Sequence, residues 1–457
     1  MADRTRAVAI AIASHLIVIL ATAMVVSPNS VDERFGVSPR TNTQLGAFLK
    51  ENAADMATRL PRRPYVFSLI VGTPPQNITG ALHINGELVS MPCVECAANT
   101  PCNDNRPDAY LVGESRTLDV ELCTSQRCQR LAPQNQRTCG GGSRACQYTY
   151  TYGGRNETAG FLATEAFAFG ETRANVTFAC GVRNVESFGG APGVVGLSRG
   201  NLSLVTQLQL GRFSYYLAPE EDHAGDAGNA SFVLFGDDAA PRTGNTSYTR
   251  LVVTNATGHP DYYYVALAGV RVGAKNLAIT GGGGGGGSLD VVVSSSLPIT
   301  YLEKSAYDLL KQELMSTLGS NTADGSALGL DLCYTNTGGG GVKEFPAMAL
   351  VFAGGEVMEL KPRNYVYRDE STGLVCLTIL PSPEDVSSSA LGTLIQTGTH
   401  MIYDVQGSRL GFESFDLLPS KSGSSDRPPS SAATPPRNIS PATIACFVWC
   451  VVASIVL

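Results

Sequence analysis

Between residues 65 and 412 the chain alternates short apolar runs with clusters of glycine, proline, asparagine and serine. The apolar run 65–71 (YVFSLIV), followed by 72–75 (GTPP), shows the pattern. Runs of this length between turn-forming residues are typical of β-strands. Helical spacing is clear chiefly in 305–318, where four leucines recur at that spacing: Leu309, Leu310, Leu314 and Leu318. The pattern predicts an all-β fold with a minor helical part.

The beginning of the chain has the features of a secretory signal peptide. Arg4 and Arg6 precede an apolar run that extends to Val26, and Ala21-Thr22-Ala23 is a small-x-small cleavage site. We therefore expect a signal peptide at 1–23, with a membrane anchor as the alternative.

The end of the chain has a second apolar run, 442–457, preceded by a polar segment rich in serine and proline, 417–441. Small residues, a polar spacer and an apolar tail together form the signal for a glycosylphosphatidylinositol (GPI) anchor. Ser430 and Ser431 are the candidate attachment sites. A short transmembrane tail is the alternative.

Composition narrows the classes of partner. With 457 residues and 43% hydrophobic content, the chain can bury a large core. Its net charge of −7, without clustered Lys or Arg, argues against nucleic acids and against anionic membrane surfaces. The glycine runs 281–287 and 338–341 lack the Lys and Ser/Thr of a phosphate-binding loop, which indicates flexible surface insertions.

Twelve cysteines occur, and ten remain once Cys446 and Cys450 in the tail are set aside. In an exported protein these ten predict disulfides: Cys93, Cys96, Cys102, Cys123, Cys128, Cys139, Cys146, Cys180, Cys333 and Cys376. The pair Cys93-x-x-Cys96 could bind a metal or do redox work, but structural half-cystines are favoured. We expect neither a metal nor a cofactor.

N-glycosylation sequons predict exposed loops or strand edges where they are used. Before the linker they lie at Asn77, Asn156, Asn175, Asn201, Asn229, Asn245 and Asn255, and another lies at Asn438.

Six motifs follow one another along the body of the chain. They are VGTPPQ at 71–76, LVSMPCVEC at 88–96, CQYTYTYG at 146–153, GVVGLSRG at 193–200, YYV with VRVG within 263–273, and LGT, YDV and LGF within 391–412. In this order they resemble the pepsin-type aspartic peptidase family, most closely its plant nepenthesin-like and xylanase-inhibitor-like branch. The resemblance implies a bilobal fold, in which two β-barrel-like lobes flank a cleft and each supplies one aspartate.

With this resemblance the chain divides into six expected segments. They are a signal peptide (1–23), an extension or pro-like segment (24–61), an N-terminal lobe (62–250), a C-terminal lobe (251–416), a linker (417–441) and an apolar tail (442–457). Cys333 and Cys376 are the only body cysteines of the second lobe, so we expect them to pair, while the pairing of the other eight stays open.

The family's reaction needs two carboxylates about 3 Å apart, which share one proton so that one acts as base and the other as acid. Alignment on 88–93 places the first aspartate at His83, and alignment on 300–302 places the second at Ser294. Glu87 and Asp290 each lie four residues away, about 13 Å along a strand, and cannot substitute. The sequence therefore predicts that both catalytic aspartates are replaced.

Tyr152 matches the family's flap tyrosine, which lies over the cleft; a plain strand aromatic is the alternative. A serine hydrolase triad built on His83 and Ser294 is disfavoured, because no Gly-x-Ser-x-Gly elbow surrounds the serine.

These features predict a catalytically inactive, inhibitor-like binding protein outside the cell, whose partner is a protein or peptide such as a cell-wall glycosidase. We expect it on the outer surface of the plasma membrane, held by a GPI anchor. An active aspartic endopeptidase is the first alternative, and a structural cell-surface glycoprotein is the second.

Overall fold

The computed structural model describes residues 35–37, 65–94, 108–131, 136–139, 144–152, 156–170, 172–184, 191–219, 231–254, 259–279, 287–335, 344–383 and 388–414. The predicted signal peptide, linker and apolar tail lie outside these ranges, as do Cys96, Cys102, Ser430 and Ser431. So do Asn229, Asn255, Asn438 and, apart from Gly287, both glycine runs.

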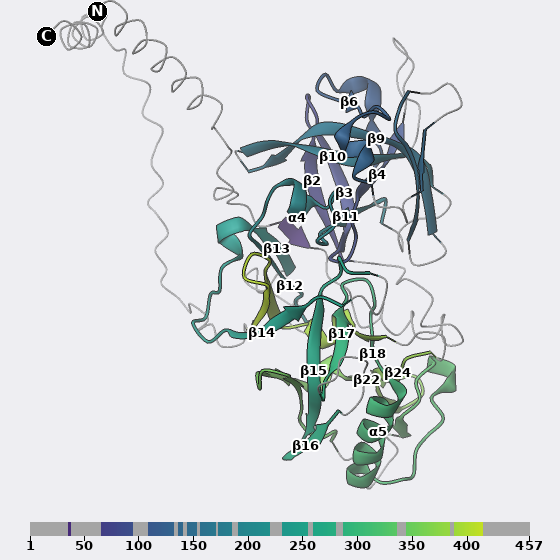
Figure 1. The fold of residues 1–457 in the computed structure, drawn as a ribbon. Helices are drawn as coiled ribbons and strands as arrows, with labels where there is room; N and C mark the ends of the chain where they lie inside the picture. Colours follow the sequence, from purple (N-terminus) through teal and green to yellow (C-terminus); the bar gives the residue numbers. More distant parts are fainter. Residues whose placement is uncertain are drawn as a thin grey trace, which may run out of the picture. The chain divides into compact units, whose positions relative to one another are not determined.

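The described residues are mostly β-strands, as the apolar pattern predicts. A ten-stranded sheet contains β2 (Val66–Val71), β3 (Gln76–His83), β4 (Val89–Val94), β5 (Tyr110–Leu111), β6 (Asp119–Val120), β7 (Arg137–Thr138), β8 (Gln147–Tyr152), β9 (Asn156–Phe169), β10 (Thr172–Asn184) and β11 (Gly193–Gly196). The sheet curls into a barrel, because β10 pairs with both β4 and β9. These strands form the first lobe (Figure 1).

A fourteen-stranded sheet contains β1 (Phe35–Val37), β12 (Arg212–Tyr216), β13 (Ser231–Phe235), β14 (Ser247–Val252), β15 (Tyr264–Val272), β16 (Lys275–Ala278), β17 (Leu289–Val293), β18 (Thr300–Leu302), β20 (Met348–Phe352), β21 (Val357–Leu360), β24 (Ile379–Pro381), β25 (Ser389–Leu391), β26 (Thr399–Asp404) and β27 (Arg409–Ser414). The strands from β15 to β25 form the second lobe, while β12, β13 and β14 lie at its junction with the first (Figure 1). A third sheet contains β19 (Cys333–Thr335), β22 (Val366–Asp369) and β23 (Leu374–Leu377).

The helices of the described part are short, with one exception. The short ones are α3 (Gln126–Gln129), α4 (Leu204–Gln207), α6 (Thr393–Gln396) and the 3-10 turns η1 (Val112–Glu114), η4 (Gly236–Ala239), η5 (Ser326–Leu328) and η6 (Pro362–Asn364). The long helix, α5 (Lys304–Leu318), begins one residue before the predicted segment. Within the described residues, no helix combines the length and apolar character that crossing a bilayer requires.

Only two of the four leucines at helical spacing are buried in α5, Leu310 and Leu314. Tyr307, Leu310 and Leu314 are buried, whereas Leu309 is 42% exposed. Tyr307, Leu310 and Leu314 are spaced three and four residues apart and so share one face, while Leu309 is turned about 100° from Leu310. Leu309 therefore lies outside the buried face of the helix.

Each lobe contains the same three-strand unit. In the first lobe β11 lies between β3 and β4, parallel to β3 and antiparallel to β4. In the second lobe β25 lies between β17 and β18, parallel to β17 and antiparallel to β18. The loops 84–88 and 294–299, which join the outer strands of each unit, are therefore equivalent positions of an internal repeat.

Candidate functional site

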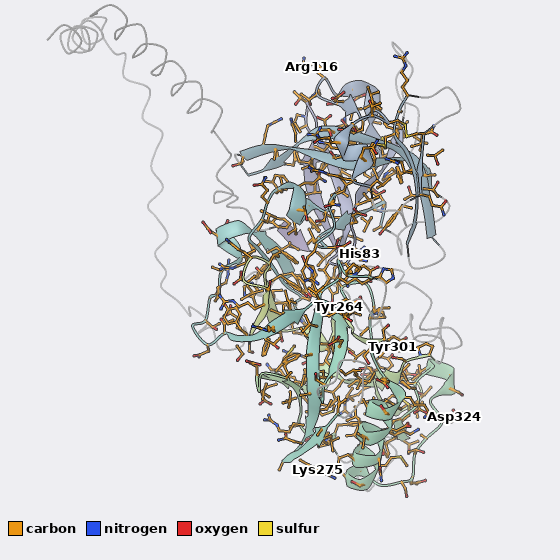
Figure 2. All side chains as sticks on the ribbon, in the orientation of Figure 1. His83, Arg116, Tyr264, Lys275, Tyr301 and Asp324 are labelled. Carbon is orange, nitrogen blue, oxygen red and sulfur yellow. A yellow bond between two sulfur atoms is a disulfide. The ribbon has the colours of Figure 1, made fainter. Side chains whose placement is uncertain are left out.

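The structure brings together the two loops that the sequence aligns with the family's aspartate loops. Ser295 Oγ accepts a hydrogen bond from the Ile84 backbone N–H (3.1 Å) and donates to the Leu82 carbonyl (2.9 Å). His83 stands between those two residues, and Ser294 directly precedes Ser295. Figure 2 shows His83 at the junction of the lobes. The two candidate positions thus lie where strands β3 and β17 meet two loops that are in direct contact.

Asn85 makes the reciprocal contact from the first lobe to the second. Its Nδ2 donates to the Val293 carbonyl (2.7 Å), and its Oδ1 accepts from the Tyr263 backbone N–H (3.1 Å). The side chain is 7% exposed, so these bonds are shielded from water. This role was not predicted from the sequence. The position of a polar residue between Ile84 and Gly86, next to the apolar end of β3, was the one local indication of it.

The Ser294 hydroxyl makes hydrogen bonds within its own turn. Ser294 Oγ accepts hydrogen bonds from the backbone N–H groups of Ser296 and Leu297, each at 3.2 Å, and lies 3.1 Å from Ser296 Oγ. The residue is 4% exposed. Two amides therefore point at the position where a carboxylate would be stabilised, but a hydroxyl there is not a base near neutral pH.

His83 is buried and uncharged. It is 8% exposed, and burial lowers the pKa of its imidazole to about 3. A Cβ on Gly86 would lie 2.2 Å from His83 Nδ1, so only glycine at 86 leaves room for the ring. His83 is therefore neutral in mildly acidic solution, and it carries no negative charge at any pH.

Arg199 connects the end of the first lobe's three-strand unit to the start of the second lobe. Its Nη2 donates to the Tyr262 carbonyl, and also to the Pro260 carbonyl at 3.3 Å. Its guanidinium lies 5.4 Å from the centre of the Tyr263 ring. The Tyr263 hydroxyl in turn donates to the Leu197 carbonyl at 2.8 Å. The sequence placed Arg199 within a family motif without indicating this function.

The other predicted site residues are the flap tyrosine, the cysteines and the sequon asparagines. Tyr152 ends β8, and only its backbone is described. Four disulfides occur among the described residues: Cys93–Cys180, Cys123–Cys139, Cys128–Cys146 and Cys333–Cys376. Four of the described sequon asparagines have exposed side chains: Asn77, Asn175, Asn201 and Asn245. For Asn156 only the backbone is described.

Among the described residues, one group of three side chains has the spacing of metal ligands. The Sγ atoms of Cys123, Cys128 and Cys139 lie within 4.8 Å of one another. All three sulfurs are in disulfides, so none is a thiolate that could bind a metal.

Two family models match the lobes in chain order, "Xylanase inhibitor N-terminal" over residues 65–237 and "Xylanase inhibitor C-terminal" over residues 262–414. The aspartic proteinase nepenthesin-1 of Nepenthes gracilis is 31% identical over 77% of this chain and 77% of its own. This chain belongs to the pepsin-like aspartic proteinase family.

A further relative and a solved structure agree with this assignment. Aspartyl protease 37 of rice (Oryza sativa subsp. japonica) is 29% identical over 76% of this chain and 79% of its own. The fold resembles that of conglutin gamma, a basic 7S globulin from lupine seeds, with a TM-score of 0.58 and 20% identity over 77% of this chain and 91% of the other. The bilobal β fold of this aspartic proteinase family member agrees with the sequence-based prediction.

Proposed function

We propose that this member of the aspartic proteinase family binds a partner outside the cell and does not cleave peptide bonds. His83 and Ser294 stand where the family reaction needs its two carboxylates. Neither side chain has a carboxyl group. The pair therefore cannot share one proton between two carboxyls, and it cannot supply a carboxylate as general base to a water molecule. General acid–base catalysis alone contributes about 10² to 10⁴ in rate, and loss of water positioning adds to that.

The observation that carries this proposal is the hydrogen bonding at the two loops. Ser295 contacts the backbone on both sides of His83, which supports the alignment of His83 and Ser294 as paired positions. The Ser294 hydroxyl is engaged by the amides of Ser296 and Leu297, and His83 is buried in uncharged form. A neutral pair of this kind favours a structural role for the junction.

The partner we propose is an extracellular protein or peptide, with a cell-wall glycosidase as the specific candidate. Both lobes match models named for xylanase inhibitors, and those names supply the candidate. Export through a signal peptide at 1–23, glycosylation at exposed sequons and a GPI anchor near Ser430 or Ser431 form part of the same proposal.

An active endopeptidase is the second candidate, because nepenthesin-1, named as an aspartic proteinase, is 31% identical. The discriminating experiment is acid proteolysis of an unfolded protein substrate, with and without a transition-state inhibitor of aspartic peptidases. We expect no inhibitor-sensitive cleavage by the wild type. The Ser294→Ala variant, purified in the same way, reports contaminating proteases. Inhibitor-sensitive cleavage by the wild type that is lost in this variant would overturn our interpretation of the two loops, whereas equal cleavage by both preparations would come from a contaminant.

The binding half of the proposal has a separate test. The purified protein is titrated into a panel of cell-wall glycosidases that includes xylanases, and both binding and residual hydrolysis are measured. We expect saturable binding to at least one enzyme. A panel with no saturable binding would favour the structural glycoprotein instead.

A further inference from the structure

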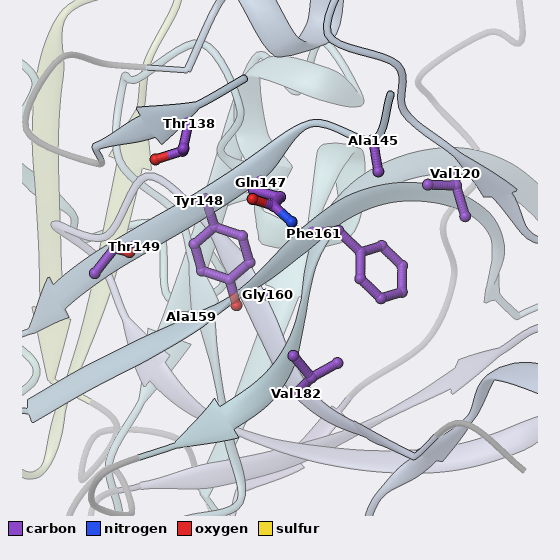
Figure 3. Close-up of a pocket in the computed structure, with 10 residues that line it drawn as sticks. All are labelled: Val120, Thr138, Ala145, Gln147, Tyr148, Thr149, Ala159, Gly160, Phe161 and Val182. Carbon is purple, nitrogen blue, oxygen red and sulfur yellow. The ribbon is translucent and has the colours of Figure 1, made fainter. Parts of the chain in front are cut away.

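A groove on the first lobe lies apart from the two loops at the junction. It is a cavity of about 650 Å³ on the hairpin formed by β8 and β9, bordered by β6, β7 and β10. Figure 3 shows Gln147 of β8 near its middle, with Phe161, Val120 and Val182 toward one side. Cavities of about 300 to 1,000 Å³ are the size that small ligands occupy in proteins.

Alternation along β8 separates the groove from the core. Tyr148 and Tyr150 are buried in a hydrophobic cluster together with Leu162 of β9. Gln147 and Thr149, whose side chains project to the other side of the strand, line the groove, and Gln147 is exposed. The outer face of the hairpin is therefore available to a ligand, whereas its inner face supports the barrel.

Three polar side chains of the groove are uncharged and available to a ligand, whereas the hydroxyl of Tyr148, which also lines the groove, lies 3.1 Å from Thr158 Oγ1. Among the described residues, the side chains of Gln147, Thr149 and Thr138 make no hydrogen bond to protein, and no ionisable carboxylate, ammonium, guanidinium or imidazole lines the cavity. They offer one planar amide and two hydroxyls. A neutral ligand rich in hydroxyl groups can satisfy all three without the desolvation of a charge.

The apolar side of the groove supplies an aromatic surface. Phe161 packs partly against the main core cluster yet remains partly exposed, and it lies within the cavity wall with Val120 and Val182. Val120 is 37% exposed and Val182 is 49% exposed, which places both among the few large hydrophobic side chains exposed in the described part. A ligand with apolar C–H faces as well as hydroxyls would cover this surface and release its water.

We propose that this groove binds a short neutral oligosaccharide. Sugar rings carry hydroxyls for Gln147, Thr138 and Thr149, and their C–H faces pack on an aromatic ring such as Phe161. The uncharged wall disfavours acidic sugars, because a carboxylate would lose hydration without gaining a cationic partner. Binding there would hold the protein on a polysaccharide, independently of the junction between the lobes.

The test is calorimetric titration of the full-length protein with the neutral trisaccharides of xylose, glucose and N-acetylglucosamine, and with the acidic trisaccharide of galacturonic acid. We expect saturable binding of at least one neutral probe and weaker binding of the acidic one. Gln147→Ala should weaken binding about fivefold and Phe161→Ala about tenfold. Leu309→Ala on α5 removes a similarly exposed apolar side chain elsewhere and should leave affinity within about twofold.

Because Phe161 also contacts the core, its variant is compared with Gln147→Ala, whose site is exposed and whose folding should be unaffected. Failure of all neutral probes to saturate at about 10 mM would overturn the proposal. Affinities equal to wild type in both groove variants would do the same. Saturable binding of an uncharged hydrophobic peptide in place of the sugars would show that the groove is a peptide site.

Discussion

At the scale of single residues, two polar side chains hold the loops of the two lobes together. Ser295 reaches from the second lobe to the backbone of Leu82 and Ile84, and Asn85 reaches from the first lobe to Val293 and Tyr263. All four hydrogen bonds join parts of the chain about two hundred residues apart. The junction is thus maintained although neither flanking position, His83 or Ser294, has a charge to contribute.

Replacing Asn85 with alanine should weaken the whole molecule. The change leaves the buried Tyr263 N–H without its acceptor and removes the donor to the Val293 carbonyl. A buried backbone group left unpaired costs about 1–3 kcal/mol, so we expect the free energy of unfolding to fall by about 2–3 kcal/mol. Urea denaturation followed by fluorescence measures this.

Asn276→Ala is the matched control, because Asn276 is exposed on β16. It should change the free energy of unfolding by no more than about 0.5 kcal/mol. Equal stability of Asn85→Ala and wild type would show that water replaces the amide at no cost and that Asn85 does not hold the lobes.

The sequence predicted the positions of His83 and Ser294 in the two loops but could not predict how the loops are joined. The flanking strands have clear apolar patterns, so each loop could be located by local alignment. The partners of Asn85 lie 208 and 178 residues away, and no local pattern indicates them. For the same reason the pairing of Cys93 with Cys180, 87 residues apart, stayed open.

At the scale of elements, a glycine at the end of the central strand allows close backbone packing in each three-strand unit. Gly196 follows Val194 and Val195 at the end of β11, and Gly392 follows Leu391 at the end of β25. A Cβ on Gly196 would lie 2.4 Å from the Gly86 carbonyl oxygen, and one on Gly392 would lie 2.2 Å from that of Ile299. The obstacle in both lobes is backbone, which cannot move without moving the loop that carries His83 or Ser294.

Alanine at either glycine should therefore be severely destabilising. Overpacking against backbone costs about 1–3 kcal/mol or more, and we expect at least the upper value for Gly196→Ala and for Gly392→Ala. Gly211→Ala is the control, since its Cβ would meet only the flexible Gln406 side chain, at 3.2 Å. Yield of folded protein and the urea midpoint measure the effect. A midpoint for Gly392→Ala like that of Gly211→Ala would contradict the close approach.

The type of each long element was predictable, but the sheet order was not. The helix at 304–318 and the β-rich remainder follow from apolar periodicity. The pairing of β12 with β26 joins strands from the middle and the end of the body, and only tertiary packing determines it.

At the scale of the whole molecule, the fourteen-stranded sheet includes strands that precede and follow the second lobe in the sequence. It contains β12 and β13, and it also contains β26 and β27 from the end of the body. Glu413 of β27 is fully buried beside this sheet, where Oε1 lies 2.8 Å from His400 Nδ1 and accepts from the Arg242 N–H at 2.8 Å. Thr243 and Thr246 donate to its other oxygen. An ionised carboxylate thus supports the junction.

Acid should destabilise this protein. Burial tends to raise the pKa of Glu413, but hydrogen bonds involving His400, Thr246, Arg242 and Thr243 outweigh it and lower the pKa far below its ordinary 4.5. The carboxylate therefore contributes stability above about pH 4.5, which is lost as the pH falls further.

Burial of His83 also makes the protein less stable as the pH falls, and it does so over a higher pH range than Glu413. Its pKa is about 3 in the folded chain against an ordinary 6.5, so the unfolded chain takes up a proton first as the pH falls. Stability contributed by the neutral ring is therefore lost from about pH 6.5 toward pH 3. Together the two groups should lower the free energy of unfolding by at least about 2 kcal/mol between neutral pH and pH 4.

Urea midpoints at pH 7, 5.5 and 4 measure the loss, and two variants assign it. His83→Asn should flatten the decline between pH 7 and 5.5, and Glu413→Gln should lower stability at pH 7 but flatten the decline below pH 4.5, because each removes one titrating group. His259→Gln, an exposed histidine, should leave both limbs unchanged. A wild type whose urea midpoint stays constant down to pH 4 would contradict the burial of a neutral His83. It would also match the acid tolerance that a working acid peptidase needs, so the same curve bears on whether the junction of the lobes is built for binding or for catalysis.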